Sequence, residues 1–85
     1  MYYLYILKCA DKSLYTGITT DLKRRVGEHK GKKLGSKYVA ARLPVSLVYT
    51  RKFRNRSTAS REETRIKSLS RVQKLDLIKK GNMLK

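Results

Sequence analysis

Two short runs near the start of the chain carry the side-chain pattern of paired strands. Residues 2–8, YYLYILK, are rich in aromatic and branched side chains and predict a strand. Turn chemistry follows at Asp11 and Ser13, and the next run, SLYTGI, predicts a second strand. Residues 2–18 are therefore expected to form a β-hairpin, and Gly17 within it is typical of a bulge or of a close approach by another group.

A third strand is expected to begin at Pro44, where a proline costs no ladder hydrogen bond. The run PVSLVYTRKF shows two-residue alternation. Val45, Leu47 and Tyr49 are on one side, and Ser46, Val48 and Thr50 are on the other.

Helical patterns fill the remaining segments. Thr20 is a suitable N-cap for a helix over residues 21–30, and Ser57 for a helix over residues 58–69. Residues 31–42, with two glycines and many cations, predict a loop with a short helical turn near KYVAAR.

The end of the chain predicts a separate last helix. Ser70–Gln73 matches a capping box, and Gly81 is a plausible stop. Its apolar side is expected to consist of Val72, Leu75 and Ile78. The order β-β-α-β-α-α predicts an α+β fold, a small three-stranded antiparallel sheet flanked by helices. With 85 residues, one domain over 1–85 is the natural division.

The net charge is the feature of the composition that says most about the partner of this protein. Lys and Arg number 22 and Asp and Glu 6, which gives a net charge of +16. Such a density of positive charge repels itself and indicates a polyanionic partner, above all nucleic acid. A membrane surface is disfavoured, because no expected helix has a bulky apolar face and no run reaches spanning length.

Cysteine usage limits the chemistry further. Cys9 is the only cysteine, so neither an internal disulfide nor a thiolate zinc site is available. The opening residues lack the basic start and long apolar core of a signal peptide. A reducing, cytoplasmic setting is expected.

The six acidic residues restrict any metal site. Only Glu62 and Glu63 look free to serve one site, whereas a two-metal nuclease needs several converging carboxylates. A metal enzyme of this sequence should therefore use one hard cation with one protein carboxylate and several waters, which suits Mg²⁺.

The helix over residues 21–30 carries two candidate functional side chains. Leu22 and Val26 define its buried stripe, and Arg25 lies roughly 60° from Leu22. His29 lies roughly 40° from Arg25, so both point along the border between core and solvent. Arginine suits phosphate binding and histidine suits proton transfer. The alternative is a solvated basic helix face with an incidental histidine.

The next helix offers the acid. Its apolar stripe consists of Ala59, Ile66 and Leu69. Glu62 falls near the centre of that stripe and Glu63 at its edge, so Glu63 is the better ligand by the same border argument. The alternative is that both are surface acids paired with nearby cations. Those cations would be Arg61, Arg65 and Lys67.

Tyrosines complete the candidate site. Tyr3 and Tyr5 share one face of the first strand, and Tyr15 lies in the partner strand near Gly17. A phenol titrates near pH ~10 and becomes a useful base only where nearby cations lower its pKa. Arg25, His29 and a metal ion are expected to have that effect. The alternative is that the tyrosines only pack the sheet.

Four segments in order carry a family resemblance. They are YLY at 3–5, YTG at 15–17, LKRRVGEH at 22–29 and REETRIKSLSR at 61–71. Together they resemble the GIY-YIG nuclease superfamily, and are most similar to its small, single-domain bacterial group of uncharacterised GIY-YIG proteins. The resemblance implies cleavage of one DNA strand per site by water attack, with one Mg²⁺ or Mn²⁺ ion.

The resemblance also implies roles for five residues. Tyr5 corresponds to the tyrosine that activates the attacking water, and Tyr15 to the one that arranges phosphate and water. Arg25 corresponds to the phosphate-binding arginine and His29 to a histidine of many members. Glu63 corresponds to the glutamate that binds the divalent metal.

Some positions depart from the family pattern. YLY lacks the glycine of the first motif, and YTG replaces Tyr-Ile-Gly. Many members have an asparagine after the glutamate helix, for which Asn82 is the candidate here, and the additional DNA-recognition domain of larger members is not expected in this chain.

The prediction is therefore a divalent-metal-dependent DNA endonuclease for repair or processing, structure-selective or weakly sequence-selective, acting on branched or nicked DNA. The side chains expected to contact the DNA backbone are those of Arg24, Lys30, Lys32, Lys33, Lys37 and Arg42. One alternative is a basic DNA- or RNA-binding module without turnover, whose affinity would fall steeply with salt. Another is a structural partner of a repair protein, which would expose an apolar patch.

Overall fold

Strand β1 (Tyr2–Cys9) forms the centre of the molecule in the computed structural model, which describes the backbone of residues 1–31 and 37–83 and the side chains of 1–30 and 39–81. It lies between β2 (Leu14–Thr19) and β3 (Val45–Phe53), antiparallel to both, in the sheet order β2-β1-β3. Residues 4–7 of β1 are buried, as expected for a middle strand covered on both faces.

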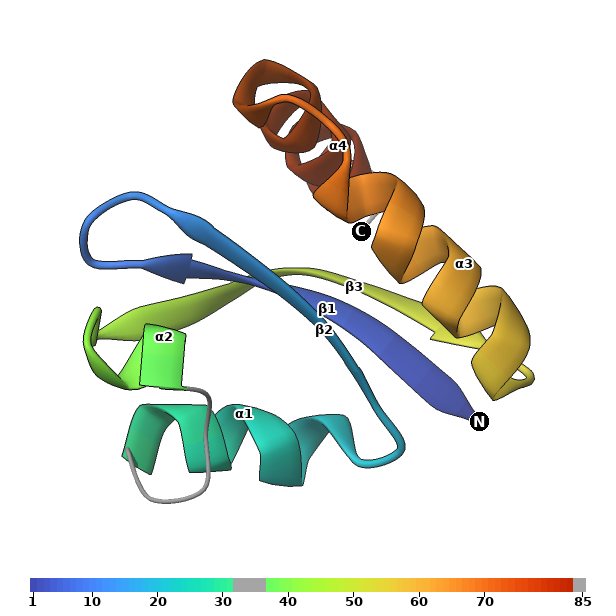
Figure 1. Ribbon diagram of the computed structural model, residues 1–85, viewed down its shortest axis with the longest axis horizontal. Coiled ribbons are helices and arrows are strands. Elements are labelled where there is room, and N and C mark those ends of the chain that lie inside the picture. The colour runs from blue at the N-terminus through green and yellow to red at the C-terminus, as the bar shows by residue number, and fades with distance from the viewer. Residues whose placement is uncertain (32–36, 84–85) are drawn as a thin grey trace.

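The helices form a layer on each face of this sheet (Figure 1). Helices α1 (Leu22–Gly31) and α2 (Lys37–Ala40) cover one face, and α3 (Arg56–Lys67) and α4 (Arg71–Met83) cover the other. The α+β architecture and the order of the main elements are confirmed, and α2 is the short helical turn expected within the loop.

The two faces have separate cores, fixed by the alternation of side chains along β1. On the α1 side, the buried cluster is Tyr5, Leu7, Cys9, Val39 and Val45, with Leu22 and Val26 packed against it. On the α3 side, it is Leu4, Ile6, Tyr49, Ile66 and Ile78.

A β-bulge in β3 overturns the expected alternation of that strand. Ile6 pairs with Tyr49 but Leu7 pairs with Leu47, so Val48 is an extra residue. Because of the extra residue, side chains on the two sides of the bulge no longer follow one alternation between the faces of the sheet. Val45 therefore packs toward α1, whereas Tyr49 packs toward α3 and α4.

The expected packing face of α4 is confirmed at Ile78 but wrong at Val72 and Leu75. Val72 is 76% exposed and Leu75 is exposed as well, while Ile78 and the partly buried Leu77 contact the core. Gly81 does not end the helix. It lies within α4 against the Tyr49 ring, where an added Cβ would come within 2.8 Å of a ring carbon.

Two helix caps differ from the expectation by one or two residues. The carboxylate of Asp21, rather than Thr20, accepts from the backbone N–H of Arg24 at the start of α1. The side chain of Asn55, rather than Ser57, accepts from the N–H of Thr58 at the start of α3. The capping box is confirmed by reciprocal bonds between Ser70 and Gln73.

Candidate active site

The Tyr5 hydroxyl is the centre of the candidate site. Tyr5 lies on β1 directly opposite Gly17 of β2, and its ring extends across that glycine toward α1. Its hydroxyl oxygen is 3.0 Å from Nε2 of His29. With the ring proton of His29 on Nδ1, the hydroxyl donates this hydrogen bond. Two segments that are 24 residues apart in sequence therefore meet at one buried polar contact.

His29 is fully buried, and the expectation of a border position is wrong for this residue. The Tyr15 ring centroid lies 5.2 Å from that of His29 in an edge contact, and the Tyr5 centroid lies 5.8 Å away. Burial lowers the pKa of His29, and the positive charge of Arg25 lowers it further, so the imidazole is neutral at neutral pH.

Arg25 lies one helical turn before His29, at the partly exposed side of the same cluster. Its guanidinium binds Glu28 at 3.0 Å, and that hydrogen bond raises the pKa of Arg25. The carboxylate of Glu28 is largely shielded and also pairs with Arg24 at 3.5 Å. The three-residue spacing between Arg25 and Glu28 was the signal that could have revealed this pair.

The pKa of Tyr5 moves in the direction opposite to the expectation. Burial raises it, and this effect outweighs the lowering by Arg25, while the charges of Tyr15 and Glu63 raise it further. Neutral His29 contributes no positive charge to lower it. In this state Tyr5 is therefore a neutral phenol that is hydrogen-bonded to a neutral imidazole.

The two neighbouring glutamates of α3 have different surroundings. Glu62 accepts two hydrogen bonds from Arg65, at 2.6 and 2.7 Å, and lies 3.3 Å from Arg51. The bonds from Arg65 lower the pKa of Glu62. Glu63 is 22% exposed and pairs only loosely with Lys67, at 3.4 Å, and its charge acts on Tyr5. Both acids thus pair with cations, but Glu63 is the one coupled to the phenol.

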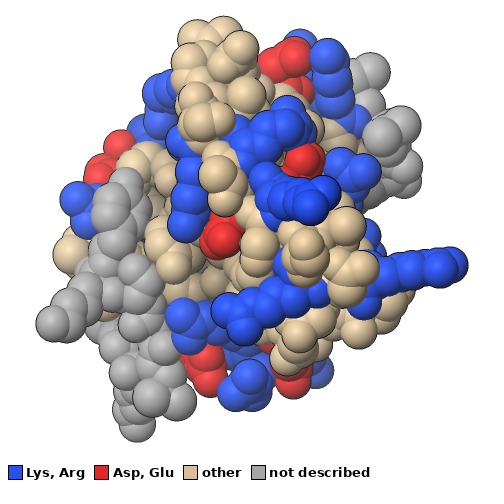
Figure 2. Space-filling view, turned by 45° about the vertical axis from the view of Figure 1, so that its right-hand side comes forward, with Lys and Arg blue, Asp and Glu red and all other residues tan. Residues whose placement is uncertain are grey.

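A polar cleft of about 440 Å³ lies beside this cluster, between α1 and the start of α3. Arg24, Arg25 and Glu28 line it from α1, and Arg56 from α3. Figure 2 shows one face of the molecule, on which Lys and Arg side chains cover much of the surface and surround a few acidic groups. An anion that enters the cleft therefore meets a strongly positive field.

The other expected backbone contacts differ in their environments. Arg24 and Lys30 are exposed on α1, and Arg42 binds Asp11 at 2.9 Å. The side chains of Lys32, Lys33, Lys37 and Asn82 lie outside the described residues.

Replacing Gly17 with alanine is expected to destabilise the fold by about 1–3 kcal/mol. An ideal Cβ at this position would lie 2.5 Å from the Tyr5 hydroxyl oxygen and 2.7 Å from Cζ, and Tyr5 is only 1% exposed, so its ring has no free space to move into. The measurement is the free energy of urea unfolding. Gly27→Ala is the matched control, since no atom of the described residues lies within 4 Å of a Cβ added there, and it should stabilise α1 by about 0.5–1 kcal/mol. A Gly17→Ala protein as stable as Gly27→Ala would contradict the close approach.

Comparison with known proteins identifies the family. The family model described as the GIY-YIG catalytic domain matches residues 1–76. The chain belongs to the GIY-YIG family. GIY-YIG domains form a family of nucleases that act on DNA, so the chain has an endonuclease-type domain.

Its relatives are small UPF0213 proteins of archaea and bacteria. One from Natronomonas pharaonis is 49% identical over 77 residues, covering 91% of this chain and 89% of the relative. One from Staphylococcus haemolyticus is 49% identical, covering 91% and 93%. The solution structure of the UPF0213 protein BH0048 from Bacillus halodurans is similar, with a TM-score of 0.62, 46% identity and coverage of 95% and 87%.

A second solution structure, of the protein EF2693 from E. faecalis, has a TM-score of 0.66 at 40% identity and covers 96% and 86%. This GIY-YIG chain therefore shares its fold with a solved UPF0213 protein and with EF2693. In the part of the chain that the structure describes, no helix has the length and apolarity needed to cross a bilayer.

GIY-YIG nucleases generally use a divalent metal, and Glu63 is the side chain whose chemistry would suit such an ion. Among the described side chains, no three of His, Cys, Asp and Glu gather as a ready ligand set. Glu63 is nonetheless an accessible carboxylate with a loose ion pair, beside the Tyr5 cluster. A single carboxylate with several waters matches the way proteins bind Mg²⁺.

Proposed function

We propose that this GIY-YIG protein is a divalent-metal-dependent DNA endonuclease that hydrolyses phosphodiester bonds with water, structure-selectively or with weak sequence preference, in DNA repair or processing. One observation carries the proposal. The Tyr5 hydroxyl bonds to His29 and its pKa responds to Arg25, Tyr15 and Glu63, so four residues from three other elements act on one group. Packing alone does not require a phenol, an imidazole, a guanidinium and a carboxylate to be gathered in this way.

Tyr5 and His29 form the proton path. As water attacks phosphorus and the P–O bond to the leaving oxygen breaks, the water proton passes to the Tyr5 oxygen while the Tyr5 proton passes to His29 Nε2 across the 3.0 Å hydrogen bond. The leaving oxygen takes its proton from solvent water. The lowered pKa of His29 keeps the imidazole ready to accept that proton at neutral pH. Tyr15, packed edge-on against the His29 ring, holds the acceptor in place.

Arg25 stabilises the charge that builds on the phosphate oxygens, and Glu28 orients its guanidinium. Glu63 would hold the divalent ion. When bound, that ion supplies Lewis-acid stabilisation of the phosphoryl oxygens and of the leaving oxygen. The exposed cations beside the cleft, Arg24 and Arg56, would contact the DNA backbone and carry no sequence information directly.

A second candidate function, binding of DNA or RNA without cutting, is favoured by one observation. Tyr5 is 1% exposed and its pKa is raised, so the phenol is shielded from solvent in the free protein. Under this alternative the polar cluster serves only to hold α1 on the sheet.

The proposal is tested with supercoiled, nicked, branched and linear DNAs incubated with and without Mg²⁺ or Mn²⁺. We expect single-strand breaks that require the divalent ion, disappear with a chelator and are most frequent on the branched or nicked DNAs. Binding that weakens steeply with salt but gives no product with either ion would establish the binding module instead.

A further inference from the structure

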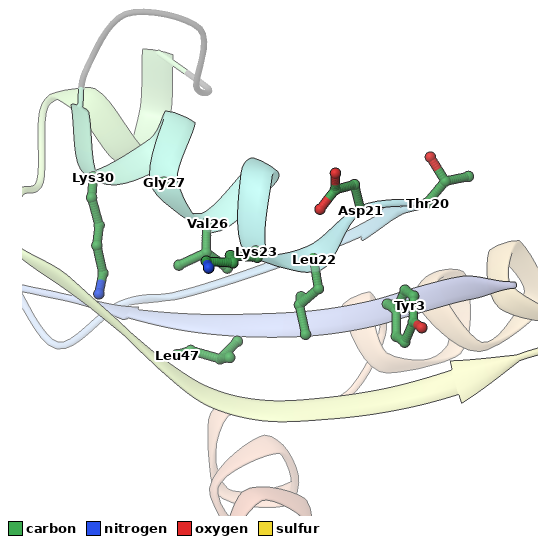
Figure 3. A pocket seen from close by; sticks show the side chains of 9 residues that line it. All are labelled: Tyr3, Thr20, Asp21, Leu22, Lys23, Val26, Gly27, Lys30 and Leu47. Atoms are coloured by element: carbon green, nitrogen blue, oxygen red, sulfur yellow. The ribbon is translucent and has the colours of Figure 1, made fainter.

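A second concave surface lies beside α1, and Figure 3 shows the side chains that line it. It is a groove of about 870 Å³ between α1, β1 and β3. Its apolar lining includes Tyr3, Leu22, Val26 and Leu47, with Leu47 38% exposed. None of these four side chains has a role in the proposed cleavage.

The groove is separated from the cleavage site by the geometry of α1. At about 100° per residue, Lys23 and Lys30 lie roughly 20° apart, and Arg25 lies roughly 160° from Lys23 and roughly 140° from Lys30. The β-bulge adds the remaining wall, since it turns Leu47 toward the α1 face of the sheet, opposite Leu7. The two surfaces therefore lie on opposite flanks of one helix.

The rim of the groove is cationic. Lys23 and Lys30 both line it, and in Figure 3 Lys30 extends down from α1 toward the strands. Lys52 adds a third ammonium group, 5.9 Å from the centroid of the Tyr3 ring. Asp21, the one acid among the described lining residues, points away from the strands in Figure 3, caps α1 and pairs with Arg24.

This combination specifies an occupant that has an apolar, flat part and an anionic part. A second copy of this chain is disfavoured, because each copy carries a net charge of +16. A nucleotide has both required parts, since its base can stack on a tyrosine ring and its phosphate attracts ammonium groups. The faces of bases inside a duplex are covered by their neighbours, so only an unpaired base can enter.

We infer that the groove between α1 and β3 binds an unpaired nucleotide of the DNA substrate, with its base against Tyr3 and Leu47 and its phosphate at Lys23 and Lys30. This inference rests on the proposed function for the identity of the nucleic acid. It supplies a physical reason for selectivity toward DNA with flaps, gaps or loops.

Photocrosslinking locates the base. A single-stranded oligonucleotide that contains 5-iododeoxyuridine is irradiated with the Glu63→Ala protein without divalent ions, and the adduct is mapped by mass spectrometry. We expect the main adduct on Tyr3. Adducts on Tyr15 or other residues, with none on Tyr3, would overturn the assignment.

Affinity measurements give an independent test. Leu47→Asp places a negative charge in the groove, and Val72→Asp places the same charge on the exposed face of α4, across the sheet. We expect Leu47→Asp to weaken single-strand binding about tenfold more than Val72→Asp does, with equal effects of both on blunt duplex. Equal losses for the single strand would refute the groove.

A third variant distinguishes a loss of binding from a loss of folding. Tyr3→Leu keeps apolar volume but removes the stacking ring, so it should also weaken single-strand binding about tenfold if the groove holds a base. All of these measurements are made without divalent ions and in the Glu63→Ala background. If the protein does not cut DNA, these binding and crosslinking results are still expected. If the groove does not bind a base, metal-dependent nicking of duplex DNA is still expected.

Discussion

Replacing Glu63 with alanine is expected to reduce Mg²⁺-dependent nicking by at least about 100-fold, because a bound ion supplies several kcal/mol of transition-state stabilisation. The protein should remain folded, since the carboxylate makes only a loose, exposed pair with Lys67. Initial nicking rates on supercoiled DNA over a Mg²⁺ titration measure the effect. The affinity of the variant for DNA without divalent ions should stay close to that of the wild type.

Glu62→Ala is the matched control, since it removes the same group one residue away. Glu62 is bound by Arg65 and Arg51, so its loss should cost at most about 1 kcal/mol of stability and leave nicking within a few-fold of wild type. Equal rates for Glu63→Ala and the wild type would end the assignment of Glu63 as the metal ligand. Equal losses in both variants would mean that the helix, rather than one carboxylate, is required.

The pairing of Tyr5 with Gly17 shows which features of the hairpin can be predicted from local sequence. The two strands pair symmetrically about Asp11, and Lys12 has a positive φ of 73°, as in a three-residue hairpin loop. The hairpin itself was predicted from its side-chain pattern. Its register depends on the backbone of the loop, and a lysine there gives none of the glycine signal that usually marks such a turn.

The surroundings of His29 show what helical periodicity leaves undetermined. The 100° rule correctly placed Arg25 and His29 on the same side of α1. It gave no information about how far the two side chains are covered, because that depends on the Tyr5 and Tyr15 rings from distant strands. The direction of the pKa shift of Tyr5 follows from this burial and was therefore predicted wrongly.

Long-range packing also explains the two errors in the apolar pattern. The bulge at Val48 lets one strand contribute to both cores, and α4 packs through Leu77 and Ile78 because Tyr49 lies against Gly81. Propensity and alternation describe single elements. They give no information about the contacts between β3 and α4, which determine the facing of both elements.

Tyr5→Phe is expected to reduce nicking by about 10²–10⁴-fold, the range for loss of a positioned proton-transfer group. The ring still packs over Gly17, but the hydroxyl that donates to His29 is lost. The free energy of unfolding should fall by about 1–3 kcal/mol, because Nε2 of a fully buried histidine loses the hydrogen bond from Tyr5. Nicking rates at saturating Mg²⁺, together with urea unfolding, measure the two effects separately.

The dependence of nicking on pH distinguishes the proton path from simple destabilisation. The pKa of His29 is lowered from 6.5, so wild-type activity should be lost only as the pH falls below that value and the imidazole becomes protonated. The residual activity of Tyr5→Phe should lack this acid limb. Tyr49→Phe, which removes a phenol from the other core, is the control and should keep both the rate and the limb. A Tyr5→Phe protein that nicks at the wild-type rate would show that the hydroxyl holds His29 in place but takes no part in cleavage.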